Sequence, residues 1–210
     1  MIATKKVLFL SIFLCFSLSH QVFALGEALS QMASDAGDFA KDVGKDVGIG
    51  TSAAKIDREA DIAWDTLLKT SPAAVSLAKT AKAVLIYPKI LKAGLGIGGQ
   101  HGEGALREHG KTVGYYNTIA GSYGLQIGAQ SFGYVMFFMD DKGLQYLLNN
   151  NSGWEVGVGP SIVLVDEGMA KTLNNTTVNE SVYVFTFSQK GLMAGAGIQG
   201  SKITKIHPDK

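Results

Sequence analysis

The spacing of hydrophobic residues changes near residue 83. Before that point apolar residues recur every three or four positions, which predicts helices at 26–50, 53–69 and, after Ser71-Pro72, 72–81. After it apolar and polar residues alternate and glycine is frequent, which predicts short strands joined by turns. Because such short connections join antiparallel strands, we expect an α+β fold with N-terminal helices packed on a Gly-rich, mainly antiparallel β-barrel or sandwich.

The expected strands are interrupted once, by a short helix after Asp140-Asp141. Pro88 is expected to stop the first strand. Residues 134–139 are apolar at every position, so both faces of that strand are expected to be covered, one by the barrel or sandwich interior and one by helices. The strands are expected at 83–87, 92–98, 103–108, 112–120, 122–130, 133–139, 154–157, 161–165, 182–187, 192–198 and 202–206.

Residues 89–104, KILKAGLGIGGQHGEG, hold six glycines among sixteen positions. Glycine costs about 0.5–1 kcal/mol relative to alanine in a regular element, so a strand this rich in glycine needs a steric reason. Either another backbone, helix or ligand approaches too closely for a side chain, or the strand bends sharply. Both alternatives predict a crowded region of the fold.

Two partial nucleotide-binding motifs lie in the same region. Gly94, Gly96 and Gly99 satisfy G-x-G-x-x-G, but that fingerprint requires a helix to follow, and the sequence that follows is Gln-His-Gly-Glu-Gly. The sequence Gly110-Lys111-Thr112 lacks the P-loop glycine five positions earlier, where Ala105 stands. Both patterns are interpreted as strand and turn.

Residues 1–24 resemble a secretory signal peptide. Lys5 and Lys6 precede a short apolar run, and Val22-Phe23-Ala24 has the small-residue spacing of a cleavage site. The run also contains Cys15, the one cysteine of the chain, but a bulky Leu14 occupies the position where a lipoprotein needs a small residue. Cleavage would leave a mature chain without cysteine, which excludes disulfides and cysteine-ligated zinc. We therefore expect an exported protein, periplasmic or extracellular.

Residues 25–52 are expected to form an amphipathic helical lead, and residues 53–210 the main domain. The lead carries valine every four residues in its tandem KDVG repeat, but three glycines weaken it as an isolated helix. It therefore docks on the domain or on a membrane surface, or else it is disordered.

Composition and charge exclude several classes of function. The mature chain of about 186 residues is long enough for one domain with a full core. Without Lys5 and Lys6, 17 basic residues face 18 acidic ones, so no overall charge attracts nucleic acid. An anionic partner must be bound by a local cluster of cations.

Few residue patterns in the chain indicate catalysis. His101 and His109 flank a glycine turn with Glu103 and Glu108 nearby, which is the one candidate for a metal site. No serine or threonine has the surroundings of a nucleophile such as G-x-S-x-G. We therefore expect no enzymatic activity, no cofactor and no metal.

Four blocks of the sequence together resemble the SYLF-domain family, whose members are described as lipid-binding. They are AKAVLIYPKILKAGLGIGGQHGEGALRE, GYYNTIAGSYGLQIGAQSFGYVMFFM, GWEVGVGPSIVLV and VFTFSQKGLMAGAGIQGSKITKI, in this order between residues 69 and 206. With its signal peptide, the chain is similar to the exported bacterial members rather than to the eukaryotic members that add an SH3 domain and contact actin.

The resemblance implies that a basic surface near the helices binds anionic phospholipid headgroups, which are phosphoinositides in eukaryotic members. Residues 69–92 supply five lysines with no acidic residue between them. The lysines proposed to bind lipid are Lys69, Lys79, Lys82, Lys89 and Lys92. The other interpretation of these residues is a solvated face that only keeps the protein soluble.

Two functions of different classes remain. The first is a lipid-binding module, peripherally associated with the membrane. The second is a non-catalytic scaffold or carrier that binds a protein partner or an apolar ligand in the glycine-lined interior. The sequence does not predict the oligomeric state or the identity of the lipid.

Overall fold

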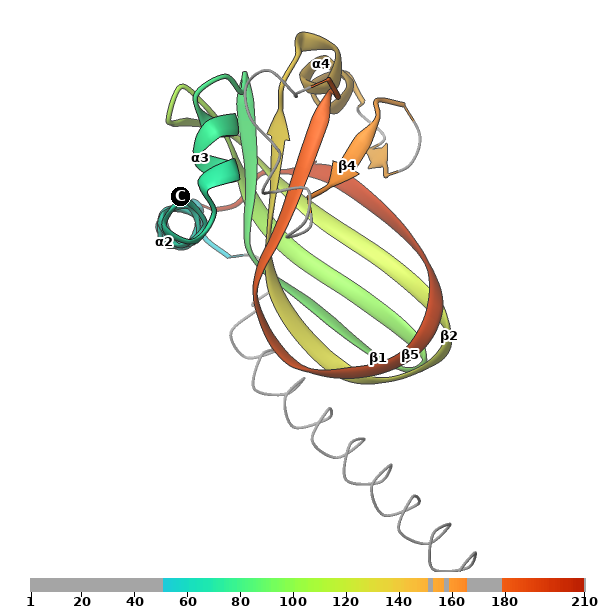
Figure 1. Ribbon diagram of the computed structural model, residues 1–210. Coiled ribbons are helices and arrows are strands. Elements are labelled where there is room, and N and C mark those ends of the chain that lie inside the picture. Colours follow the sequence, from blue (N-terminus) through green and yellow to red (C-terminus); the bar gives the residue numbers. More distant parts are fainter. Residues whose placement is uncertain (1–50, 151–152, 157–158, 166–178, 210) are drawn as a thin grey trace, which may run out of the picture.

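The computed structural model describes residues 51–150, 153–156, 159–165 and 179–209, and for 95–97, 122–126 and 191–200 it describes the backbone alone. The predicted signal peptide, Cys15 and the helix at 26–50 therefore lie outside the described residues. The described part begins with two helices and continues into long strands that form a strongly curved sheet. A third helix lies on the other side of this sheet (Figure 1).

The two N-terminal helices form where the apolar spacing predicted them. Helix α2 spans Ala53–Thr70, and its buried residues, Ile56, Ala60, Ala63 and Leu67, recur every three or four positions and so form one stripe. Helix α3 spans Pro72–Ala78, and the Ser71 side chain accepts a hydrogen bond of 3.3 Å from the backbone N–H of Ala74. Pro72 occupies the first turn, where its missing N–H costs nothing.

Three long strands replace most of the short strands expected from the sequence. Strand β1 spans Ala83–Glu108, β2 spans Lys111–Phe138 and β5 spans Val182–Ile206. Two short strands, β3 at Trp154–Glu155 and β4 at Ile162–Leu164, both pair with β5. The described strands form one sheet in the order β1-β2-β5-β3, antiparallel except for the parallel pair β4 and β5. The predicted α+β class, with helices on a mainly antiparallel glycine-rich sheet, is confirmed.

The expected stop at Pro88 is wrong, because β1 continues through this residue. The pairing of β1 with β2 shifts register between Tyr87 and Ile90, so Pro88 lies in a bulge. Strand β1 is also at the edge of the sheet. A proline without an N–H is tolerated at such a position because the ladder does not require its donor.

A tight turn joins β1 to β2 at His109 and Gly110. Both residues have positive φ angles, 50° and 77°, which is the conformation of the two-residue turns that match the twist of a hairpin. The Gly110-Lys111-Thr112 sequence is thus the start of a hairpin strand, and Gly94 to Gly99 lie inside β1 with no helix after them. The structure confirms that neither glycine pattern is a nucleotide-binding loop.

The glycines at the end of the 89–104 stretch allow β1 to pack against itself. A Cβ atom on Gly104 would lie 2.5 Å from the backbone oxygen of Ile86, and one on Gly102 would lie 3.0 Å from the backbone oxygen of Lys89. The second half of β1 therefore crosses directly over the first half. Of the two alternatives that the glycine content left open, close approach of another backbone is the one found at Gly102 and Gly104, and it accompanies the strong curl of the sheet in Figure 1.

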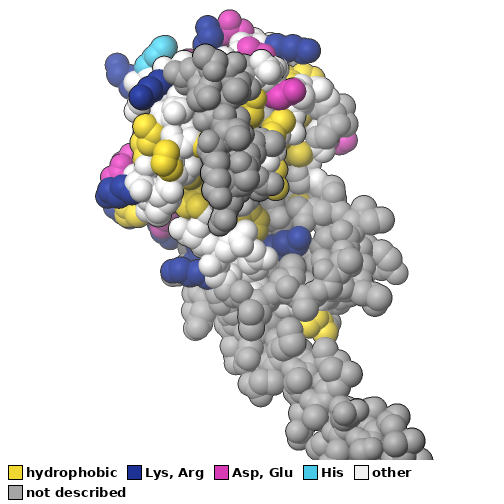
Figure 2. Space-filling view, in the orientation of Figure 1, with side chains coloured by type: hydrophobic (Ala, Val, Ile, Leu, Met, Phe, Trp, Pro, Cys, Tyr) yellow, Lys and Arg dark blue, Asp and Glu magenta, His cyan; other side chains and the backbone are white. Residues whose placement is uncertain are grey.

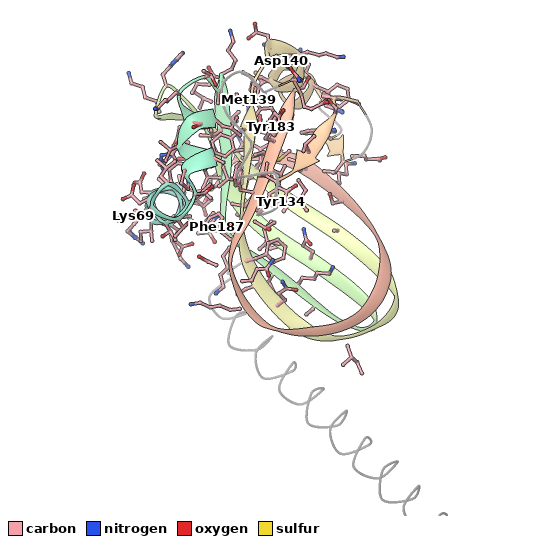
Figure 3. All side chains as sticks on the ribbon, in the orientation of Figure 1. Lys69, Tyr134, Met139, Asp140, Tyr183 and Phe187 are labelled. Atoms are coloured by element: carbon pink, nitrogen blue, oxygen red, sulfur yellow. The ribbon has the colours of Figure 1, made fainter. Side chains whose placement is uncertain are left out.

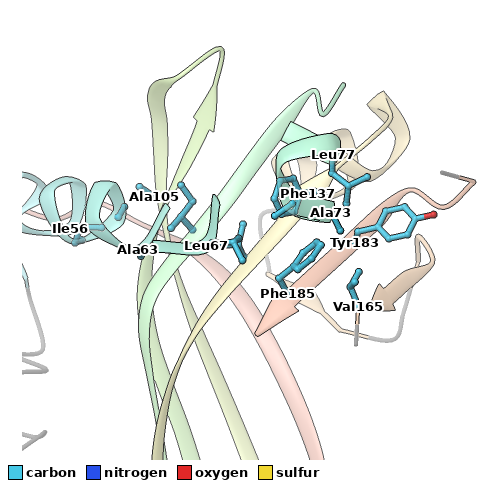
Figure 4. Packing of buried hydrophobic residues seen from close by; sticks show 14 residues of the cluster. Ile56, Ala63, Leu67, Ala73, Leu77, Ala105, Phe137, Val165, Tyr183 and Phe185 are labelled. Carbon is cyan, nitrogen blue, oxygen red and sulfur yellow. The ribbon is translucent and has the colours of Figure 1, made fainter. Parts of the chain in front are cut away.

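Hydrophobic cores lie on both faces of the sheet where β2 runs through residues 134–138. On one face, Phe137 and Phe185 pack against α2 and α3 through Leu67 and Leu77 (Figure 4). On the other face, Met136 and Phe138 pack with residues of α4, which spans Asp141–Asn149, and with Trp154 of β3. The prediction that both faces of this apolar strand are covered is confirmed.

Asp140 begins α4 as an N-cap residue. Its carboxylate accepts hydrogen bonds from the backbone N–H of Gly143 at 2.7 Å and from the Ser181 hydroxyl at 2.7 Å. Burial raises the pKa of this carboxyl group, but these hydrogen bonds and the nearby Lys142 outweigh it and hold the net pKa below the usual value. The same residue thus ends β2, begins α4 and ties both to the start of β5.

No described helix has the length and hydrophobicity needed to cross a bilayer.

Candidate functional site

Three of the five proposed lipid-binding lysines surround the short helix α3. Lys69 lies in the last turn of α2, Lys79 is the C-cap residue of α3, and Lys82 directly precedes β1. All three are exposed. Helix α3 has seven residues and is therefore about 10 Å long, with Lys69 before its N-terminal end and Lys79 and Lys82 after its C-terminal end. We call Lys69, Lys79 and Lys82 the α3 lysines.

Part of this positive charge is offset by α4. The Lys82 Nζ lies 3.6 Å from an Asp141 carboxylate oxygen, and the two side chains are 53% and 76% exposed. An ion pair this exposed is weak, so Lys82 can exchange Asp141 for another anion at little cost. Figure 2 shows basic and acidic side chains intermixed over the described surface in that view, which agrees with the balanced overall charge.

The other two lysines lie on opposite faces of the sheet. Lys89, in the β1 bulge, lines a small groove beside α2 together with Ile62 and Thr66. Lys92 lines a larger cavity on the other face, together with Ile90 and Thr118. The structure therefore brings three of the five lysines together around α3 and places the remaining two on separate surfaces.

The larger cavity is bounded by the curled sheet and by the segment that contains β4. Its volume is about 720 Å³, within the range of about 300–1,000 Å³ that is usual for small-ligand sites. One part of its lining is apolar and another part is polar. The apolar part includes Ile90, Phe132, Tyr134, Ile162 and Val184, and the polar part includes Lys92, Gln100, Thr118, Gln130 and Ser201.

The two parts of the lining follow one another along β2. Tyr134, Phe132 and Gln130 occupy every second position of β2, so all three side chains face the cavity. Phe132 lies opposite Ile90 in the register, and Gln130 lies opposite Lys92. At about 3.3 Å per residue, the three β2 positions span about 13 Å. The cavity thus changes from apolar near Tyr134 to polar near Lys92, and Figure 3 shows Tyr134 at the end of the curl nearer to the helices.

Lys92 is the one charged side chain among the described residues that line this cavity. Its neighbours in the lining are amides and hydroxyls, and no described carboxylate lines the space. Lys92 is partly buried, and no described carboxylate of the lining balances its positive charge, which favours an anionic ligand. The sequence pattern did not reveal which residues line the cavity, because they come from β1, β2, β5 and the segment around β4, which are distant from one another in the sequence.

Burial raises the pKa of Tyr134 to about 12, and burial followed by the charges of Tyr134 and Tyr116 raises the pKa of Tyr87 well above its usual value. The folded protein thus holds these phenol protons more tightly than the unfolded chain, whose tyrosines ionise near pH 10. Above pH 10 the folded state binds more protons, so the free energy of unfolding must fall as the pH rises.

We expect Tyr134 alone to account for a loss on the order of 2 kcal/mol between pH 10 and pH 12. Urea unfolding at pH 8, 10, 11 and 12 measures this loss, and absorbance at 295 nm reports when the phenol ionises. The Tyr134→Phe variant should show a shallower decline than the wild type. An identical decline in both proteins would contradict the assignment to Tyr134.

His101 and His109, the histidines that the sequence suggested for a metal site, do not form a metal site with the other described residues. His101 lies within β1 opposite Ile119, whereas His109 is in the hairpin turn. Across the described part of the chain, no three His, Cys, Asp or Glu side chains are placed to hold a metal ion.

One comparison with known proteins gives a match. A family model named Ysc84, described as "Las17-binding protein actin regulator", matches residues 119–208, which include most of β2 and all of α4, β3, β4 and β5. No curated protein and no solved structure matches the chain. The matched part ends with the strand that pairs with β2 and carries part of the cavity wall.

Proposed function

We propose, since residues 119–208 belong to the Ysc84 (SYLF) family of binding domains, that this protein recognises anionic phospholipid headgroups at a membrane surface. It acts by binding and not by catalysis. The signal-like pattern of residues 1–24 favours a location outside the cytoplasm, periplasmic or extracellular, with peripheral attachment to the membrane.

The observation that carries this proposal is the grouping of the α3 lysines. Lys69 and Lys79 are exposed at the C-terminal ends of two helices, and Lys82 has only a weak, exposed ion pair. Each lysine near an anionic membrane surface contributes about 1 kcal/mol of attraction, so three of them give weak, reversible and salt-sensitive binding. Lys89 and Lys92 face other surfaces and are not needed for this contact.

Co-sedimentation with vesicles of increasing phosphatidylglycerol content tests the proposal. Retention of the full chain should rise with the anionic fraction and fall between 50 and 300 mM salt, because screening shortens the range of the attraction. The double variant Lys69→Glu/Lys79→Glu should reduce the partition coefficient at least about thirtyfold, because it removes about 2 kcal/mol of attraction and the two glutamates are repelled by the anionic surface.

A matched variant with the same change in charge provides the control. Lys190→Glu/Lys202→Glu changes two exposed lysines on β5, away from the α3 lysines in the fold, and should alter retention much less. Circular dichroism confirms that each variant is folded. Equal losses in the two double variants would show that overall charge, and not the α3 lysines, governs attachment, and unchanged retention in both would reject the proposal.

The cavity favours a second candidate function, that of a non-catalytic carrier. A volume of about 720 Å³ with both apolar and polar walls is suited to a single small molecule rather than to a membrane surface. A carrier predicts binding of a soluble ligand in the absence of vesicles, which the surface-attachment proposal does not require.

A further inference from the structure

The cavity inside the curled sheet combines three features that define a ligand by its chemistry. It has one cation, Lys92, with no described carboxylate in the lining. It has amide and hydroxyl groups beside that cation, including Gln130 directly opposite in the register. It also has an apolar wall whose partly buried residues include Phe132, Tyr134 and Ile162. A ligand that satisfies all three features is anionic at one end and hydrocarbon at the other.

We propose that this cavity binds a single amphiphile whose anionic oxygens pair with Lys92 and whose hydrocarbon part lies against Phe132, Tyr134 and Ile162. The site is separate from the α3 lysines, so the inference goes beyond the proposed attachment to a membrane surface. With one cation, the cavity favours a singly charged group, because a second negative charge would be desolvated without a partner.

The rim of the cavity supports an amphiphile rather than a small polar anion. Leu164 of β4 lines the cavity and is 59% exposed, which makes it one of the few large exposed hydrophobic side chains in the described part of the chain. Its neighbour in the lining, Ile162, is only partly buried against the core. A hydrocarbon chain between Tyr134 and Leu164 would cover apolar surface that is otherwise in contact with water.

Polar groups further along the cavity set the orientation. Thr118, Gln130 and Ser201 lie with Lys92 in the polar part and supply hydrogen-bond donors for the oxygens of a carboxylate or a phosphodiester. Two kinds of amphiphile carry such oxygens: a free carboxylic acid with a hydrocarbon chain, and a phospholipid. The experiment below distinguishes between them.

Calorimetric titration of the full chain with decanoate and with 1-decanol, in the absence of vesicles, tests the inference. The wild type should bind decanoate at least tenfold more tightly than the alcohol of equal length, because only the acid pairs with Lys92. Lys92→Met, which keeps an unbranched side chain but removes the charge, should weaken decanoate binding about tenfold or more and leave 1-decanol binding within twofold. Lys92→Arg should restore most of the preference.

Lys89→Met provides the matched control, because it removes one lysine from the same strand but from the opposite face of the sheet. It should bind decanoate as the wild type does. Equal affinity of the wild type for decanoate and 1-decanol, absence of saturable binding to either, or an unchanged preference in Lys92→Met would each overturn the inference.

The same Lys92→Met variant in the vesicle assay identifies the source of the amphiphile. Retention on phosphatidylglycerol vesicles that stays at the wild-type level, with decanoate binding lost, indicates a free acid as ligand. A loss of both indicates a phospholipid that enters the cavity from the bilayer. Failure of vesicle retention in the wild type, with decanoate binding intact, would reject the proposed function and leave this site standing.

Discussion

Replacing Gly104 by alanine is expected to lower the free energy of unfolding by about 3 kcal/mol, at the upper end of the cost of overpacking. The added Cβ would lie 2.5 Å from the backbone oxygen of Ile86 and 2.7 Å from the Tyr87 Cδ1. The oxygen belongs to the strand backbone, and Tyr87 is fully buried, so neither atom can move aside at low cost. The change forces apart the two halves of β1 that cross at this point. Urea unfolding followed by circular dichroism measures the loss.

Gly99→Ala is the control in the same strand. The nearest atom to a Cβ at Gly99 is the backbone oxygen of Ala120 at 3.9 Å, an ordinary van der Waals distance. This substitution should leave stability unchanged or raise it by up to about 1 kcal/mol, because alanine restricts the unfolded chain more than glycine does. A Gly104→Ala variant as stable as Gly99→Ala would show that the crossing of β1 over itself does not require glycine.

Replacing Asp57 by alanine is expected to lower the free energy of unfolding by about 2–3 kcal/mol. The two Asp57 carboxylate oxygens accept hydrogen bonds from the Thr112 hydroxyl at 2.7 Å and from the Tyr115 hydroxyl at 2.8 Å. Asp57 is in α2 and its two donors are in β2, so this carboxylate holds the helix to the sheet. Its removal leaves both partly buried hydroxyls without their acceptor.

A neighbouring interaction holds the same end of α2. The Arg107 guanidinium lies 2.6 Å from the Asp61 carboxylate and also donates to the backbone oxygen of Asp57 at 3.1 Å. This second link should keep the helix attached in the Asp57→Ala variant, so we expect a destabilised fold rather than a detached helix. The two links add to the buried apolar stripe in holding α2 on the sheet.

Asp65→Ala is the control for Asp57→Ala, because Asp65 is an exposed carboxylate two turns further along α2. Its loss should change stability by no more than about 0.5 kcal/mol. The pKa of Tyr115 gives a second measurement: burial raises this pKa, and the hydrogen bond and charge of Asp57 raise it further against the opposing effect of Arg107. Alkaline titration should therefore show a lower pKa for Tyr115 in Asp57→Ala. A pKa that does not change would contradict the hydrogen bond.

The helices were predictable because the residues that specify them are close together in the sequence. Ser71 and Pro72 begin α3, and Asp140 caps α4, through contacts only three residues long. The buried stripe of α2 is likewise a periodicity that can be counted along the chain. The same holds for residues 134–139, whose unbroken apolar run indicated burial on both faces before the packing elements were known.

The strand boundaries were less predictable. Pro88 and the glycines of β1 were expected to end strands. In the structure β1 continues through them, with a bulge at Pro88 and a crossing of the strand over itself at the glycines. Whether a proline or glycine ends a strand depends on the strands beside it. Pro88 is tolerated because β1 is an edge strand. That property belongs to the order of strands in the sheet and cannot be inferred from the local sequence.

The candidate site was only partly predictable for the same reason. Closeness in the sequence suggested a single basic surface for five lysines, but the bulge at Pro88 and the alternation of side chains place Lys89 and Lys92 on opposite faces. The glycine content did not mark the cavity that contains Lys92, because Gly159 is the one glycine among the described residues that line it.

The sequence alone determined the α+β class, the buried stripe of α2 and the helix starts at Ser71 and Asp140, because these depend on residues within a few positions of one another. Only the tertiary structure decided that the strands merge into a curled sheet, that the lysines divide between the α3 surface and a cavity, and that Asp57 joins α2 to β2. Each of those features requires residues distant in the chain to be adjacent in space, and such contacts form only when the long strands pair and the helices pack on the sheet.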